Sequence, residues 1–268
     1  MTHRRRTSLP TWLVRSIGPV CILAVVAAVA LSATGTGWAF AQGTPGIATP
    51  GPGTPAAATP MVGTPVATPT ENVASIRVVH ASPDAGPVEV YVDGVLAVPT
   101  LQFQSATEFA AVPAGDHEIK IAPAGAGVGA AVFTGTASLE GDKAYELAAI
   151  GPLAQLQFGQ FEVNRGPLEP NSARVRAVHA ASGVDVVDVA QVGGAVLIED
   201  VTYPGASDYT GVTVGQLALE LRSNDGASLY QVPPFDVQAG QVIDVFVTID
   251  PTTNAPAVFT VGTTAEAE

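Results

Sequence analysis

The stretch that decides the fold is Ile76–Gly94, which reads "IRVVHASPDAGPVEVYVDG". Its second part alternates strictly, with three valines on one face of an extended chain and polar or aromatic residues on the other (Val88, Val90 and Val92 against Glu89 and Tyr91). A period of two residues is typical of a β-strand with one buried face. Asp93-Gly94 is a signal for a tight hairpin turn. The stretch therefore predicts a strand, a proline-rich turn and a hairpin.

A weaker copy of this stretch follows about one hundred residues later as "ARVRAVHAASGVDVVDVAQVGG". The correspondence continues along both halves, since Thr107-Glu108-Phe109 matches Ser207-Asp208-Tyr209 and Gly141 matches Gly240. Short alternating runs separated by turn residues, with no window of helical periodicity, predict an all-β protein. We expect two tandem immunoglobulin-like β-sandwich domains of seven or eight strands each, at 73–165 and 171–262, and a disordered tail at 263–268.

The N-terminal segment, residues 1–41, has the pattern of an export signal. Basic residues precede an apolar run from Ile17 to Ala33, and Ala39-Phe40-Ala41 fits a cleavage site. An uncleaved membrane anchor is the alternative, because the apolar run is near the lower length limit for a span. Residues 42–72 repeat Thr-Pro and predict a disordered, extended stalk. The sequence thus favours a secreted or cell-surface protein.

Charge and cysteine content exclude several classes of function. Beyond the N-terminal segment the chain holds seven basic and 24 acidic residues, a formal charge of −17. Such a chain repels nucleic-acid phosphates and anionic lipid, so we expect no nucleic-acid partner and membrane contact only through an uncleaved N-terminus. Cys21 is the single cysteine and lies in the apolar run. Thiol chemistry and cysteine-based metal sites are therefore not expected, and no cofactor is predicted.

Two stretches of the first repeat carry a resemblance to a known family. "RVVHASPDAGPVEVYVDG" and "ATEFAAVPAGDHEIKIAPAG" resemble the domain-of-unknown-function 4397 family of exported bacterial proteins. The second repeat departs from this pattern, because it lacks the Pro-Asp turn and has "QVGG" in place of "VDG". The resemblance implies a secreted or surface β-sandwich, commonly in tandem. It implies no activity.

Histidine and arginine recur at matching positions in the two copies. His80 and His179 end their strands on the face expected to point into the sandwich, and we expect each ring to hold the following loop by a hydrogen bond. Arg77 and Arg176 lie on the opposite face, where each guanidinium should pair with an acid; the cross-strand candidates are Glu89 and Asp188.

The loop that differs between the copies is the candidate interaction site, and its residues are Ser82, Pro83 and Asp84. No nucleophile elbow, zinc-protease helix, phosphate loop or calcium loop occurs. We therefore expect a non-enzymatic structural, adhesion or protein-binding module whose partner is an unknown protein or cell-wall component. The alternative is an envelope module for a small ligand or cation. The least favoured function is an atypical carboxylate hydrolase.

Overall fold

The computed structural model describes residues 72–266, and this part of the chain falls within one compact unit. The N-terminal segment and nearly all of the Thr/Pro-rich stalk lie outside the described residues, so the interpretations given to them remain predictions. Strands dominate, as expected, and the helical pieces of the described part are two short 3₁₀ turns, η1 (Val128–Ala130) and η2 (Leu153–Gln155). No helix in residues 72–266 has the length and apolarity needed to cross a membrane.

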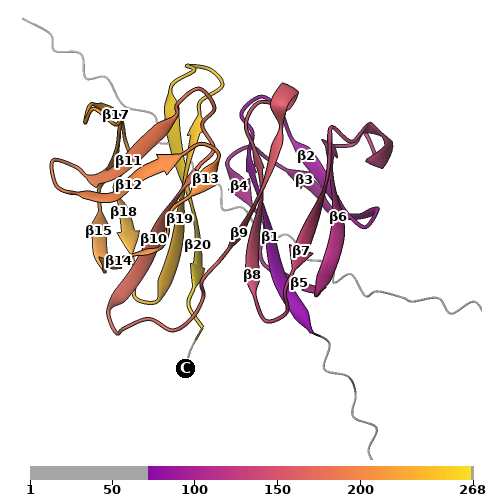
Figure 1. Cartoon of the computed structure of the whole chain (residues 1–268), viewed down its shortest axis with the longest axis horizontal. Helices are drawn as coiled ribbons and strands as arrows, with labels where there is room; N and C mark the ends of the chain where they lie inside the picture. The colour runs from indigo at the N-terminus through magenta and orange to yellow at the C-terminus, as the bar shows by residue number, and fades with distance from the viewer. Residues whose placement is uncertain (1–71, 267–268) are drawn as a thin grey trace, which may run out of the picture. The chain divides into compact units, whose positions relative to one another are not determined.

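The first half of the described chain folds into two sheets that pack as a sandwich (Figure 1). The β1 sheet has the order β4-β1-β8-β9, with β5 also on β1; its strands are β1 (Val73–Ala81), β4 (Ser105–Ala106), β5 (Ala110–Pro113), β8 (Ala144–Ile150) and β9 (Gln157–Glu162). The β2 sheet has the order β3-β2-β6-β7; its strands are β2 (Val88–Val92), β3 (Val95–Leu101), β6 (Gly115–Pro123) and β7 (Phe133–Leu139).

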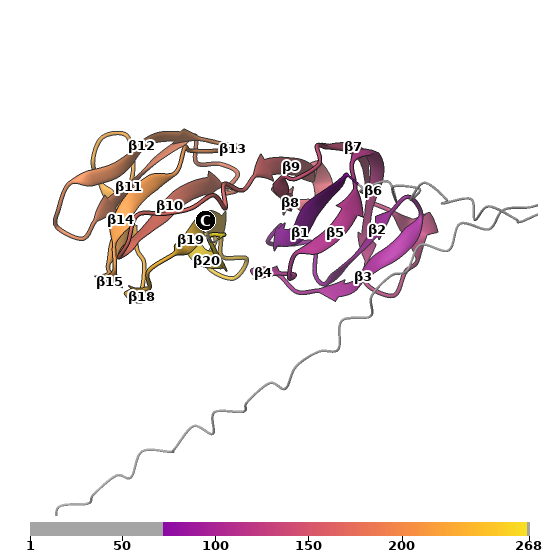
Figure 2. The same ribbon diagram turned by 90° about the horizontal axis from the view of Figure 1, so that it is seen from below.

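The second half repeats the arrangement (Figure 2). The β10 sheet has the order β13-β10-β19-β20, with β14 also on β10; its strands are β10 (Ser172–His179), β13 (Gly205–Ala206), β14 (Thr210–Thr213), β19 (Gln241–Ile249) and β20 (Pro256–Thr264). The β11 sheet has the order β12-β11-β16-β17, beside a pair β15-β18; these strands are β11 (Val186–Gln191), β12 (Val196–Thr202), β16 (Leu219–Arg222), β17 (Ser228–Gln231), β15 (Gly215–Leu217) and β18 (Phe235–Val237).

Each half has its own hydrophobic core between its two sheets. In the first half the core includes Ile76, Val90 and Leu147, one from each of three strands. In the second half the equivalent positions are taken by Val175, Val189 and Val245. The alternation read from the sequence is confirmed, because Val88 and Val90 of β2 both face this core. The two-residue hairpin is confirmed as well: Val92 pairs with Val95, and Asp93 and Gly94 both have positive φ, as a type I′ turn requires.

The strand count differs from the expectation of seven or eight per half, since the described chain has nine strands up to residue 162 and eleven after it. Part of the excess arises where a side chain interrupts a ladder. Thr107 donates its backbone N–H to Val78, while its hydroxyl accepts the N–H of Val78. Ser207 makes the same two contacts with Ala177. Each hydroxyl splits one strand into two short ones, β4 with β5 and β13 with β14.

The expectation of a disordered tail at 263–268 is wrong for its first residues. β20 extends to Thr264, because Gln241 of β19 pairs with that residue. The chain is held for two further residues, since the N–H groups of Ala265 and Glu266 donate to the carbonyls of Gly240 and Arg165. Backbone groups that are paired in this way do not fray freely.

Candidate functional site: a buried arginine–acid cluster between the β1 and β10 sheets

The β1 and β10 sheets are buried on both faces. Their central strands β8 and β19 have nearly every residue buried, although strand alternation sends only every second side chain into the local core. The other side chains form a third hydrophobic cluster shared by the two halves, which contains Val79, Ala148 and Ile150 from the first half and Val178 and Phe246 from the second. The two sheets therefore pack against each other through their second faces.

Strand register places one arginine beside one acid in each half. Arg77 of β1 is the direct neighbour of Glu146 on the parallel strand β8. Arg176 of β10 is the direct neighbour of Asp244 on β19 in the same way. The guanidinium Nε of Arg77 donates to Glu146 Oε1 at 2.7 Å, and Nε of Arg176 donates to Asp244 Oδ1 at 2.6 Å. Each half thus supplies one ion pair on the shared face.

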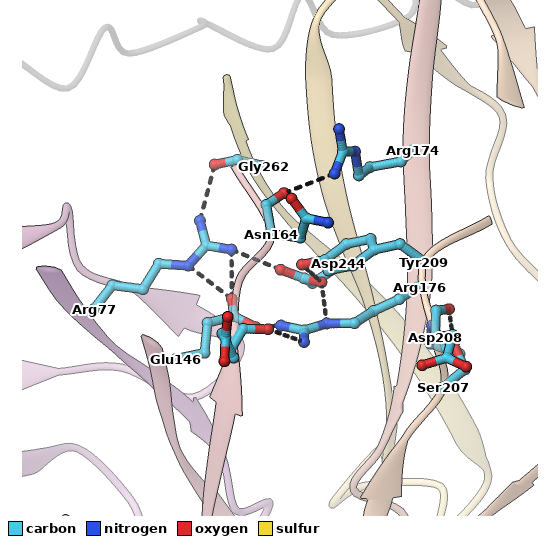
Figure 3. A network of polar contacts seen from close by, with 12 residues as sticks. Arg77, Glu146, Asn164, Arg174, Arg176, Ser207, Asp208, Tyr209, Asp244 and Gly262 are labelled. Atoms are coloured by element: carbon cyan, nitrogen blue, oxygen red, sulfur yellow. Dashed lines mark hydrogen bonds and ion pairs between the residues drawn. The ribbon is translucent and has the colours of Figure 1, made fainter. Parts of the chain in front are cut away.

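Two further ion pairs join the halves, as Figure 3 shows. Arg77 Nη2 donates to Asp244 Oδ2 at 2.8 Å, and Arg176 Nη2 donates to Glu146 Oε2 at 2.9 Å. Each carboxyl group is bound by both arginines, so the four side chains close into a ring of two guanidinium and two carboxyl groups. We call this set the arginine–acid cluster; its members are Arg77, Glu146, Arg176 and Asp244.

The third nitrogen of each guanidinium, Nη1, also has a hydrogen-bond partner. Arg77 Nη1 donates to the carbonyl of Gly262, and Arg176 Nη1 donates to the carbonyl of Glu162. Each guanidinium also lies over an aromatic ring of its own half, Phe109 at 4.8 Å and Tyr209 at 4.7 Å from the ring centroid. Every hydrogen bond of one arginine therefore has a counterpart at the other.

Burial sets the energetics of the cluster. Arg77 is 2% exposed, Arg176 is 4% exposed, and Glu146 and Asp244 are fully buried. Removing four ionisable groups from water is costly, and their mutual attraction offsets that cost only while every partner is in place. Loss of one partner leaves a buried charge uncompensated, at a cost of about 3–5 kcal/mol. The cluster consequently fixes the register of the two sheets more strongly than it adds net stability.

The two acids of the cluster differ in their surroundings. The hydroxyl of Tyr209 donates to Asp244 Oδ1 at 2.8 Å, whereas the matching residue beside Glu146 is Phe109, which has no hydroxyl. Burial, with the nearby negative charge of Asp244, raises the pKa of Glu146 to about 8, and the two arginines oppose that shift. Burial likewise raises the pKa of Tyr209, so its hydroxyl stays protonated and continues to donate.

The expected partners of the two arginines are wrong. Glu89 accepts hydrogen bonds from Tyr91 and from the backbone of Gly125 and Gly127, and Asp188 accepts one from the backbone of Asp200. Both acids lie on the β2 and β11 sheets, across the local core from the arginines. β1 pairs with β8 rather than with β2, and β10 pairs with β19, so the acid beside each arginine comes from a strand that is distant in the sequence.

His80 and His179 lie in the local cores, on the face opposite the arginine–acid cluster, and both are fully buried. Nδ1 of each ring accepts a backbone N–H two residues on, so the neutral ring carries its proton on Nε2. Nε2 of His80 then donates to the carbonyl of Gly86 at 2.7 Å and holds the loop that follows. Nε2 of His179 has no partner among the described residues.

Burial lowers the pKa of both histidines. For His80 the carbonyl of Gly86 opposes the shift, and the pKa remains below its ordinary value. For His179 burial outweighs the opposing effects of the Val184 backbone and of Asp185, and the pKa falls to about 4. Both rings are therefore neutral at pH 7 and act as hydrogen-bonding spacers within the core.

The loop Ser82–Asp84 is only partly accessible. Ser82 is fully buried and its hydroxyl has no partner among the described residues, so this residue is not available to an external partner, contrary to expectation. Pro83 is half-buried and Asp84 is exposed. Asp84 Oδ1 accepts the N–H of Leu153 at 2.7 Å, which ties this loop to the η2 turn.

Loops of both halves meet at this end of the sheets. The hydroxyl of Thr248, near the end of β19, donates to the carbonyl of Ala81, the last residue of β1, at 3.1 Å. The hydroxyl of Tyr203 accepts from Gln157 at 3.4 Å and lies so close to Gly151 that a Cβ there would be only 2.5 Å away. We call the loops at 82–87, 151–156, 182–185 and 250–255 the loop face.

The surface of the described residues includes two hollows. One, of about 250 Å³, lies beside the cluster between Phe109 and Gly262, and its walls are mostly polar. The other, of about 540 Å³, is an open depression near Asp185 and Asp225. Within residues 72–266 no three histidine, cysteine, aspartate or glutamate side chains lie close enough together to hold a metal ion. The hollows therefore give no specific support to a cation site.

Sequence reasoning missed Glu146 and Asp244. A signal for them was present, because each is a single acid inside an otherwise apolar strand, "AYELAAI" and "QVIDVFVTI". A charge in the middle of a strand buried on both faces requires an opposite charge nearby. The two recurring arginines supplied that opposite charge at matching spacing.

The fold and the site together define a class of protein: an all-β, sandwich-like protein whose β1 and β10 sheets share a buried, reciprocal ion-pair cluster. Residues 74–190 match the family model described as "Domain of unknown function (DUF4397)". The match covers the first half and the start of the second, in agreement with the resemblance read from the first repeat. A search of curated proteins found no match.

Several solved structures show weak similarity. One is a streptococcal family 41 carbohydrate-binding module that recognises α-glucan, with 12% identity, coverage of 69% of this chain and 96% of that chain, and a TM-score of 0.24. Another is a candidate cell adhesion protein from Bacteroides ovatus, with 9% identity, coverage of 73% and 98%, and a TM-score of 0.21. Scores this low carry no functional conclusion for this chain.

Proposed function

We propose that the protein is an exported, non-catalytic binding or adhesion protein of the cell surface or medium, in which two β-sandwich domains, at 73–165 and 171–262, act as one rigid unit. The observation that carries this proposal is the arginine–acid cluster. It joins the β1 and β10 sheets through two ion pairs that cross between the halves. A fixed pairing of two sandwiches presents the loops of both to one partner.

The loop face is the surface that we assign to the partner. Its loops come from both halves, and the segments next to these loops are joined by the Thr248–Ala81 and Tyr203–Gln157 hydrogen bonds. Loops positioned by a rigid scaffold are where binding residues concentrate. The loop face includes exposed polar residues, such as Asp84, Gln155 and Asp185, which suit a polar partner such as a protein or a cell-wall component.

The proposal is tested by binding of the labelled exported chain to cells of its source that lack their own copy. A loop-face variant with Gln155→Arg and Asp185→Arg should lose at least about tenfold in bound protein, because it places two long cations on the partner surface. The matched control is Asp116→Arg with Asp208→Arg, which makes the same kind of change away from the loop face. Equal binding by both variants, or loss only in the control, would overturn the assignment of the loop face.

A further inference from the structure

The arginine–acid cluster is reciprocal, and a reciprocal face could in principle pair with a copy of itself. In a symmetric interface, residue i contacts residue j and j contacts i. The ion pairs obey this rule, because Arg77 binds the acid of the second half and Arg176 binds the acid of the first. The polar contacts by themselves would therefore allow first-half to first-half pairing as well as the observed pairing.

The apolar contacts around the cluster are not reciprocal. Two residues after each acid, β8 has Ala148 where β19 has Phe246, and both belong to the shared hydrophobic cluster. Phe246 is fully buried and stacks on Phe259 of β20 with ring centroids 5.0 Å apart. The first half thus contributes a small residue at the position where the second half contributes a large one.

A hydrogen bond between the halves is not reciprocal either. Thr248 of β19 donates its buried hydroxyl to the carbonyl of Ala81. The matching residue of β8 is Ile150, which has no donor, and the carbonyl that matches Ala81 belongs to Ala180. Two first halves placed face to face would leave both Ala81 carbonyls without this partner, which is costly for a buried acceptor.

We propose that the shared face of the first half is a docking surface specific for the face of a second half, with the cluster setting the register and the asymmetric residues setting the choice of partner. Two first halves would leave a void opposite Ala148, and two second halves would bring two Phe246 rings into one space. Either penalty disfavours self-pairing of the faces. The partner of this surface is therefore the second half of the same chain or, if the link is opened, of another copy.

The first test opens the link between the halves in the otherwise intact protein. A protease site is inserted at 166–170 of the full chain, the uncut protein is checked for wild-type melting, and the chain is then cut. Native mass spectrometry and light scattering should show one 1:1 complex of the two fragments. Separate fragments, or homodimers of either fragment, would overturn the proposal.

The second test uses variants of the cut protein. Thr248→Val keeps the shape of the side chain and removes the donor to Ala81. The two fragments should therefore bind each other more weakly, with a rise in Kd of about tenfold. The matched control is Thr213→Val on the exposed part of β14, which should leave Kd unchanged. An unchanged Kd for Thr248→Val would contradict its role in partner choice.

The third test needs no cut and therefore does not depend on how the inserted site folds. In the intact chain, Ala148→Phe and Phe246→Ala should each lower the melting temperature, the first by overpacking and the second by leaving a void. The combined variant should recover part of both losses, since the large residue has moved to the other face. Losses that simply add would show that size matching does not govern the pairing.

Discussion

Arg77 and Asp244 lie 167 positions apart in the sequence, and Nη2 of the arginine donates to Oδ2 of the aspartate at 2.8 Å inside a buried interface. The contact is matched by that of Arg176 with Glu146, at 2.9 Å. Because these two pairs share their members with the ion pairs inside each half, no member of the cluster can move without disturbing the two groups that it binds.

Removing one arginine should destabilise the protein strongly. Arg77→Ala leaves Glu146 and Asp244 with one cation between them, and we expect the free energy of unfolding to fall by about 3–5 kcal/mol. Urea unfolding measures it. The control is Lys143→Ala, whose ion pairs with Glu140 and Glu162 are solvent-exposed, and it should cost at most about 1 kcal/mol. Similar losses in both variants would mean that the cluster is not effectively buried.

Replacing the whole cluster should be milder than removing one member. A variant with Arg77→Met, Glu146→Leu, Arg176→Met and Asp244→Leu leaves no buried charge uncompensated, and such exchanges are often neutral or stabilising by about 1–4 kcal/mol. We expect it to unfold at a higher urea concentration than Arg77→Ala. The reverse order would indicate that the ion pairs themselves supply the stability.

Glu146 should make stability fall as pH rises. Its folded pKa, about 8, lies above the ordinary value of 4.5, so the folded state holds this proton more tightly than the unfolded state does. The resulting stabilisation is fully present below about pH 4.5 and is lost as pH rises through about 8. Urea unfolding at a series of pH values should show this slope in the wild type and a weaker one in Glu146→Gln. Identical slopes would be incompatible with a raised pKa.

His179 should make the stability of the protein fall as the pH is lowered, which is opposite in direction to the effect of Glu146. Because the folded pKa of His179 is about 4, below its ordinary 6.5, its contribution is present above pH 6.5 and is lost as pH falls through 4. His179→Gln should therefore reduce the loss of stability between pH 6.5 and pH 4. The comparison is made by thermal melting at each pH, with Gln155→Ala as an exposed control.

Truncating the histidines should lower the melting temperature at neutral pH, and His80→Ala should cost more than His179→Ala. His80 donates to the carbonyl of Gly86, while His179 lacks this second hydrogen bond. The difference should be about 1 kcal/mol, the usual net worth of one such bond. Unchanged melting temperatures in both variants would contradict a structural role for these rings.

The sequence predicted the sandwich halves because period-two alternation identifies the face of each strand that points into its own core, as Ile76 and Val78 show. It did not predict the shared face. Val79 and Arg77 alternate with those residues, and nothing local distinguishes a second face that meets solvent from one that meets another sheet. The partners of Arg77 were missed for the same reason, since Glu146 depends on a parallel pairing between distant strands.

The central claim is that the arginine–acid cluster couples the two halves, and a double-mutant cycle on Arg77 and Asp244 tests it most directly. The free energy of unfolding is measured for wild type, Arg77→Ala, Asp244→Ala and the double variant. We predict that the double variant is more stable than the sum of the single losses implies, with a coupling energy of about 1–3 kcal/mol. Losses that add to within about 0.5 kcal/mol would contradict the claim.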